Sequence, residues 1–142
     1  MVARMVAEGL VRGEGAEARL LGGRRRSDGK IVFPLPRGDA AEAFEAVELP
    51  THGTLWSFTV QRFRPKPPYD GPGDEGAFAP YAVGYVELPG AIIVESRLET
   101  SDFDRLRIGM PMVFTLQTFR TDADGQDVLT YAFRPAEEGD AP

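Results

Sequence analysis

The chain has 142 residues, 42% of them hydrophobic and 27% charged, which is the composition of a soluble globular protein with room for one real core. Sixteen lysines and arginines against 22 aspartates and glutamates give a net charge of −6, which disfavours a protein whose main task is to grip a phosphate backbone. The lack of cysteine excludes disulfides, thiolate nucleophiles and cysteine-ligated metals, and a single histidine, His52, excludes histidine-rich metal sites.

Residues 1–20 are predicted to form a short N-terminal helical arm. Apolar residues recur there at near-helical spacing, at Val2, Met5, Val6 and Leu10, before a glycine-broken stretch from Gly9 to Gly15. Charged residues interrupt this segment, so it has no apolar core for a signal peptide, and the chain has no run of about 20 apolar residues that would span a bilayer. We therefore expect a cytoplasmic protein without a membrane partner.

Residues 21–43 are irregular by pattern. Three consecutive arginines, a Ser-Asp-Gly turn at 27–29 and prolines at 34 and 36 exclude a long helix or a central strand. One very short strand is expected at Ile31 to Phe33.

Residues 44–135 are predicted to be all β, with strands at 44–49, 53–63, 81–88, 91–98 and in a final hairpin around Asp122–Gly125. Pro89-Gly90 suits a type II turn between two of these strands. A long proline- and glycine-rich loop covers 64–80, and a short helical turn is expected at Thr100–Asp104. Five or six strands in so small a sheet favour a closed or nearly closed barrel, and residues 136–142 are predicted to be a disordered tail.

Alternation along the strand at 53–63 predicts that Trp56, Phe58 and Val60 share one face, with Leu55 on the other. Aromatic residues are numerous in this region and have two interpretations. They fill the barrel core, which the alternation favours, or they form a platform on which the bases of a single strand stack. Residues 39–142 carry eight cations and 18 acids, so the charge of −10 disfavours the second interpretation.

The sequence gives only weak evidence for catalytic or metal-binding residues. His52 precedes a glycine at a turn and is a general base only in a stand-alone enzyme, for which the sequence offers no nucleophile in a Gly-x-Ser-x-Gly turn. The Asp122-Ala-Asp124-Gly125 segment lacks the glycine and glutamate spacing of a calcium loop. Arg24, Arg25 and Arg26 are either a solvated turn or a contact for an anionic ligand such as the phosphates of a nucleotide-like cofactor.

Several short motifs follow one another in order along residues 21–135. They are Phe33-Pro34, Gly53-Thr54-Leu55-Trp56-Ser57, Pro80-Tyr81-Ala82-Val83, Val86-Glu87-Leu88 and Ile108-Gly109-Met110-Pro111. The ordered set resembles the family that joins a rubredoxin-like zinc ribbon to an OB-fold, known as domain of unknown function thirty-five. The resemblance implies a mainly β chain: an OB-fold five-stranded barrel at 44–135, preceded by a short N-terminal helix and a degenerate, metal-free rubredoxin-like ribbon at 21–43.

The zinc ligands of that family are missing here. The positions that resemble them hold Arg25, Asp28, Asp39 and Glu42, so the paired spacing survives without the thiolates, and no metal is expected. One hypothesis is that Arg25 lies among the three carboxylates as an ion cluster that replaces the metal. The other is that the segment is looser and packs through Ile31 and Phe33; a hard cation held by the carboxylates is disfavoured by the adjacent arginines.

The resemblance implies a non-catalytic accessory subunit that binds a thiolase-like acyl-CoA enzyme, an acyltransferase or a steroid side-chain aldolase, and helps to shape its acyl-CoA site. The chain itself is expected to bind no cofactor, a coenzyme A thioester being the substrate of the complex, and the expected assembly is a heterotetramer. The alternatives are a hot-dog-fold enoyl-CoA hydratase as the partner, and a single-stranded nucleic-acid-binding barrel. Residues expected to contact the partner or CoA are Arg24, Arg25, Arg26, Arg62, Phe63, Arg64, Phe78 and Tyr81.

Overall fold

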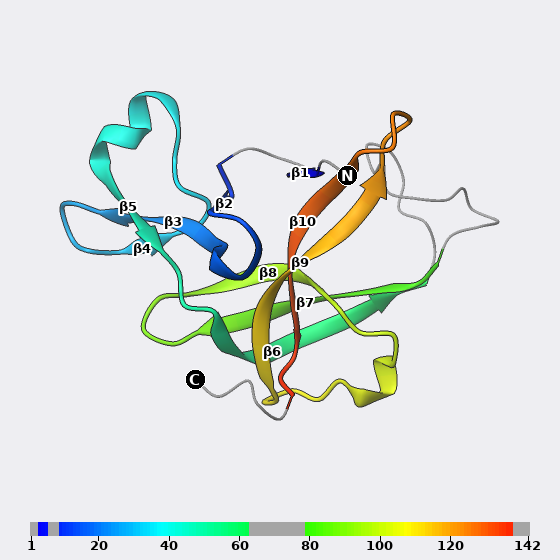
Figure 1. Ribbon diagram of the computed structural model, residues 1–142. Coiled ribbons are helices and arrows are strands. Elements are labelled where there is room, and N and C mark those ends of the chain that lie inside the picture. The colour runs from blue at the N-terminus through cyan, green and yellow to red at the C-terminus, as the bar shows by residue number, and fades with distance from the viewer. Residues whose placement is uncertain (1–2, 6–8, 63–78, 138–142) are drawn as a thin grey trace.

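A computed structural model describes residues 3–5, 9–62 and 79–137 (Figure 1). Most of the described chain is β-strand, and its helical elements are three short 3-10 turns, which confirms the mainly β prediction. The five barrel strands are β6 (His52–Gln61), β7 (Tyr81–Leu88), β8 (Ile92–Leu98), β9 (Pro111–Thr121) and β10 (Asp127–Pro135). No helix in these ranges is long and apolar enough to cross a membrane.

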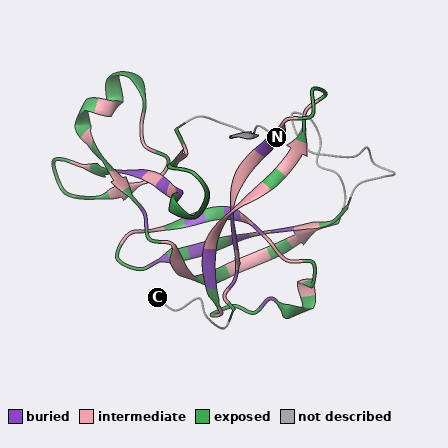
Figure 2. Ribbon diagram, in the orientation of Figure 1, coloured by how far each residue is buried: buried purple, intermediate pink, exposed green. Residues whose placement is uncertain are grey.

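The predicted closed barrel is confirmed. The strands follow one another as β6–β7–β8–β10–β9, and β9 pairs back onto β6, so the sheet has no free edge in this circuit. The β8–β10 pairing is parallel and the other pairings of the circuit are antiparallel, which is the strand order of an OB-fold. The interior is filled by buried side chains from each of the five barrel strands, among them Leu55, Val86, Val94, Met112 and Phe133. Figure 2 colours the buried positions of the ribbon purple.

The hairpin between β7 and β8 forms where its turn residues predict it. Gly90 has a φ of 70°, and the Ala91 amide donates to the Leu88 carbonyl at 3.1 Å. Proline at 89 supplies the preceding φ near −65°, so Pro89-Gly90 acts as the type II turn that the sequence indicated.

The helical turn predicted at 100–104 is the single 3-10 turn η3 (Phe103–Arg105). Its cap is Asp102, whose carboxylate accepts a hydrogen bond from the Asp104 amide at 3.2 Å, so an acid takes the place of the expected hydroxyl. Leu106, which follows the turn, is buried in the core.

A second, smaller sheet precedes the barrel and corresponds to the ribbon-like segment. It is built on β3 (Arg19–Arg25), which pairs with β2 (Val11–Arg12), β4 (Ile31–Val32) and β5 (Phe44–Glu48), with the 3-10 turn η2 (Gly38–Ala43) before β5. The prediction that placed 44–49 in the barrel is therefore wrong for this strand, which pairs with β3 from Leu21↔Glu48 to Arg25↔Phe44. Leu20 and Leu49 turn inward together and join the barrel core, so the two sheets share one hydrophobic cluster.

The predicted N-terminal helix is also wrong where the structure describes this segment. Residues Ala3–Met5 form β1, parallel to β10, and Gly15–Glu17 form the 3-10 turn η1. Gly9 and Gly13 have φ values of 83° and 84°, which no right-handed helix tolerates, so the backbone leaves helical geometry within one turn.

A β-bulge in β6 overturns the predicted face assignment. The register to β7 shifts between Leu55, which pairs with Val86, and Ser57, which pairs with Tyr85, so Trp56 is the inserted residue. Leu55 is fully buried, Phe58 and Val60 pack partly buried against the core, and Trp56 is 56% exposed. The bulge therefore puts Leu55 and Phe58 on the same side, and the indole of Trp56 faces outward.

The start of the predicted tail contacts the barrel. The Ala136 amide donates to the Pro111 carbonyl at 3.0 Å, and Glu137 pairs with Arg105 at 2.9 Å. Residues 138–142 lie outside the described residues.

Candidate functional site

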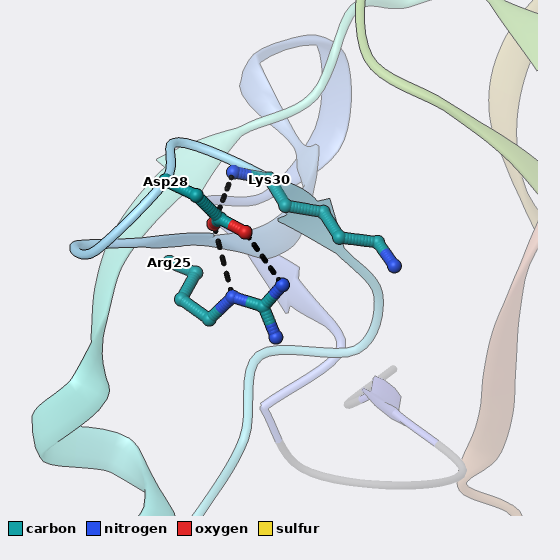
Figure 3. A network of polar contacts seen from close by, with 3 residues as sticks. All are labelled: Arg25, Asp28 and Lys30. Carbon is teal, nitrogen blue, oxygen red and sulfur yellow. Dashed lines mark hydrogen bonds and ion pairs between the residues drawn. The ribbon is translucent and has the colours of Figure 1, made fainter.

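Arg25 and Asp28, the first two residues predicted to stand in place of zinc ligands, form an ion pair in the turn between β3 and β4 (Figure 3). Arg25 Nε donates to Asp28 Oδ1 at 2.9 Å and its Nη2 donates to Oδ2 at 2.7 Å, a two-pronged contact. The same turn is closed by backbone bonds from Gly29 to Arg25 at 2.7 Å and from Arg25 to Lys30 at 2.8 Å. Arg25 and Asp28, the first pair of residues predicted to replace zinc ligands, thus bind each other.

The electrostatics of this turn follow from that contact. The guanidinium of Arg25, together with the Lys30 amide at 3.1 Å, lowers the pKa of Asp28 from 3.8 to about 2. The hydrogen bonds and charge of Asp28 in turn raise the pKa of Arg25. Both side chains are solvent-exposed, so the ion pair links two residues of one surface turn and is not part of the buried core.

The second pair, Asp39 and Glu42, does not join the first. Both lie in η2, and within the described ranges no ion pair links either of them to Arg25. Glu42 contributes only its backbone carbonyl, which accepts from Arg26 Nε at 3.2 Å. In the part of the chain that the structure describes, no group of three or more His, Cys, Asp or Glu side chains lies where it would hold a metal ion.

Three of the arginines predicted to contact a partner or CoA, Arg24, Arg25 and Arg26, lie in the ribbon segment and already contact residues of it. Arg24 pairs with Glu45 across β3 and β5 at 3.1 Å, with both side chains about half exposed, at 51% and 56%. Phe63, Arg64 and Phe78 lie outside the described residues. Arg62 precedes them, with its guanidinium carbon 5.9 Å from the centre of the Phe103 ring.

The ribbon sheet meets the barrel at an aromatic contact. The ring of Phe33, which follows β4, packs edge-on against Tyr131 of β10 with the centroids 5.5 Å apart and the planes at 87°. The Tyr131 hydroxyl donates to the Glu95 carbonyl of β8 at 3.0 Å. Burial, and secondarily the Glu95 carboxylate, raise the pKa of Tyr131.

Tyr81, the remaining predicted contact residue, lies in a shallow groove on the outside of the barrel. The groove has a volume of about 300 Å³ and is lined by Tyr81, Arg97, Phe119 and Tyr131, among others. The guanidinium carbon of Arg97 lies 3.8 Å from the centre of the Tyr81 ring and 5.0 Å from that of Phe119, so the cation is stacked between two aromatic rings.

The most exposed aromatic side chains of the described residues form another surface on the same wall. Trp56 contacts Tyr85 edge-on at 6.2 Å and 88°, and the two side chains are 56% and 43% exposed. The prediction that these aromatics fill the core is therefore wrong for Trp56 and Tyr85, because each follows an inward-facing residue, Leu55 in β6 and Gly84 in β7, and so faces outward.

His52, the only candidate base, opens β6. Its Nδ1 lies 3.0 Å from the hydroxyl of the adjacent Thr51, and its backbone pairs with Val113 of β9. The sequence placed His52 in the turn before this strand, whereas the structure makes it the first residue of the strand.

Comparison with known proteins identifies the barrel. A family model described as the C-terminal OB-fold domain of ChsH2 matches residues 46–117, which is half of the chain. The chain belongs to this family. It is therefore a member of the OB-fold family, domain of unknown function thirty-five, that its ordered motifs resemble.

Two similar proteins extend the comparison beyond the matched barrel. The chain is 28% identical over 124 residues to the benzoylsuccinyl-CoA thiolase subunit BbsA of Thauera aromatica, an alignment that covers 85% of this chain and 79% of that protein. Among solved structures, the Ltp2-ChsH2(DUF35) aldolase superposes with a TM-score of 0.59 at 24% identity, covering 84% of this chain and 86% of that one. The second comparison supports the same fold.

Sequence reasoning missed two features of this family member. One is the outward turn of Trp56, for which the signal was the pair of adjacent large apolar residues, Leu55 and Trp56, since neighbours in a regular strand cannot both face the core. The other is the stack of Arg97 between Tyr81 and Phe119, which joins residues from three strands and has no local signal.

Proposed function

We propose that this chain is the small, non-catalytic subunit of a thiolase-like enzyme that acts on CoA thioesters, an acyltransferase or a steroid side-chain aldolase. The observation that carries the proposal is the similarity to a thiolase subunit along 85% of the chain, ribbon and barrel together. The match to the ChsH2 family and the fold shared with an aldolase point to the same class of complex.

In this proposal the ribbon and barrel form one scaffold that packs on the catalytic subunit beside its acyl-CoA entrance. The ion pair of Arg25 and Asp28 closes the turn that zinc closes in relatives with cysteines. Leu20 and Leu49 pack in the barrel core and hold the ribbon sheet, which bears this turn, against the barrel. The chemistry on the thioester belongs to the partner, and the substrate of the complex is a CoA thioester.

The proposed contacts with CoA or with the partner's rim are Arg24, Arg25, Arg26, Phe63, Arg64, Phe78 and Tyr81. Arg24 illustrates how such a contact works. Its pair with Glu45 is half exposed and therefore weak, so an incoming phosphate competes for the guanidinium at little cost. A heterotetramer of two small and two catalytic subunits is the proposed assembly.

The test is a pull-down of the tagged chain from the lysate of its own organism, followed by reconstitution with the co-eluting protein. A thiolase-fold protein in one-to-one amount, whose turnover of a CoA thioester rises when this chain is added, supports the proposal. Because this chain has no cysteine, a thiol reagent that follows free CoA has no background from it. A hydratase-fold partner in one-to-one amount would instead support the alternative partner, and purification without any CoA-thioester enzyme would overturn the proposal.

A further inference from the structure

Three large apolar side chains lie together on the outer wall of the barrel, and we call Trp56, Tyr85 and Ile93 the Trp56 patch. Their exposed fractions are 56%, 43% and 38%. The indole of Trp56 contacts Tyr85. Across β7 and β8, Tyr85 pairs with Glu95 and Glu87 pairs with Ile93, so Ile93 is the diagonal neighbour of Tyr85 on the same face.

The patch includes the residue that the bulge of β6 adds. Leu55 faces the core, so its neighbour Trp56 faces outward, and because the bulge inserts Trp56 as an extra residue, Phe58 returns to the core side while a large aromatic side chain stays in water. Exposed aromatic residues that touch each other on a sheet form the kind of centre that protein interfaces favour. The patch therefore has the composition of an interface centre that the isolated chain leaves uncovered.

Two carboxylates border the patch and limit what covers it. Glu87 and Glu95 are exposed on the same face, and in the described part of the chain neither side chain takes part in an ion pair. A second copy of this chain docking through a two-fold axis would bring these carboxylates against their own equivalents. Nucleic acid would bring phosphates against them.

We infer that the Trp56 patch is the surface onto which the thiolase-like subunit docks, through an apolar surface edged by arginine or lysine. The inference rests on the proposed function, which requires a partner, and it adds the face of the barrel that the partner covers. The apolar side chains of the patch become buried against the partner, and Glu87 and Glu95 orient the partner by favouring a basic edge on its surface. The ribbon turn between β3 and β4 belongs to the other sheet and is not part of the patch.

The first experiment measures the solvent exposure of Trp56 without replacing this residue by another. Trp56 is the only tryptophan of the chain, so 5-fluorotryptophan labelling gives one ¹⁹F signal that reports on this position alone. Titration with the unlabelled thiolase-like subunit is expected to move this signal and to remove most of its sensitivity to D₂O at one equivalent. A signal that keeps its shift and its solvent sensitivity in the formed complex would overturn the inference, as would an equal change on self-association or with a single-stranded oligonucleotide alone.

The second experiment measures affinity. We expect Trp56→Ser to weaken binding of the thiolase-like subunit by at least ~30-fold, which is the loss typical of a central aromatic contact. Glu87→Arg is expected to slow association and to weaken its dependence on salt, while Glu14→Arg, the same charge reversal at an exposed position before η1, keeps the dissociation constant within about two-fold.

The outcomes separate the inference from the proposed function. If the wild-type chain binds the thiolase-like subunit and Trp56→Ser binds equally well, the patch is wrong and the proposed function stands. If the wild-type chain binds no such subunit, the proposed function fails, and the docking inference fails with it. Since Trp56 is mostly exposed, its substitution is expected to leave the unfolding temperature nearly unchanged, which circular dichroism verifies.

Discussion

The contact between Phe33 and Tyr131 tests whether the metal-free ribbon and the barrel fold as one unit. The two rings lie edge-on at 5.5 Å and 87°, and both pack against the barrel core. An edge-on aromatic pair stabilises by about 0.5–1.5 kcal/mol beyond the area that it buries. We therefore expect a coupling free energy of about 1 kcal/mol between the two side chains.

The measurement is a double-mutant cycle of Phe33→Leu and Tyr131→Leu, in which urea unfolding of the four proteins is followed by circular dichroism. Tyr131→Phe is the matched control. It removes the hydrogen bond to the Glu95 carbonyl, at a cost of about 0.5–1.5 kcal/mol, but keeps the ring, so it should leave the coupling to Phe33 unchanged.

Two results would refute this reasoning. A coupling within ~0.3 kcal/mol of zero would mean that the rings contribute only through burial. Two separate unfolding transitions in the wild-type chain would mean that the ribbon unfolds by itself, against the shared cluster of Leu20 and Leu49 with the barrel.

Three further predictions concern the barrel wall and the ribbon turn. Gly84→Ala should destabilise the fold by about 1–3 kcal/mol in urea unfolding, because its Cβ would lie 2.6 Å from the Ser57 carbonyl oxygen, and wild-type stability would contradict this close approach. Arg25→Ala should lower the melting temperature more than Arg25→Lys, which keeps the charge but loses the two-pronged contact with Asp28; equal melting temperatures for all three proteins would count against the ion pair. Because the pKa of Asp28 falls from 3.8 to about 2 on folding, its contribution to stability is complete above about pH 4–5 and disappears as the pH falls towards 2; Asp28→Asn should lose this part of the acid dependence, and an unchanged acid profile would refute the assignment.

Local signals in the sequence were enough to predict most of the barrel. Pro89 and Gly90 specify a turn by their own backbone preferences, and the alternation on either side of them specifies two strands. The Ser-Asp-Gly turn predicted at 27–29 also lies where the structure has a turn, between β3 and β4.

The two wrong assignments have different causes, one a pairing that is distant in the chain and one local. The strand at 44–48 is apolar enough to belong to either sheet, and its pairing with β3 was decided by Leu49 and Leu20 turning into the same core. The N-terminal helix was predicted from four apolar residues, but Gly9 and Gly13 have positive φ values that a right-handed helix cannot contain.

The sequence by itself determined the all-β class, the turn between β7 and β8, and the loss of every thiolate ligand, since each depends on residue type or on spacing of a few residues. Only the tertiary structure decided which way Trp56 faces and what Phe33 contacts. A period of two says that neighbours point in opposite directions, but not where a strand gains an extra residue, because the bulge is set by the register between β6 and β7. The candidate docking surface thus arises from a pairing between strands, which no single segment encodes.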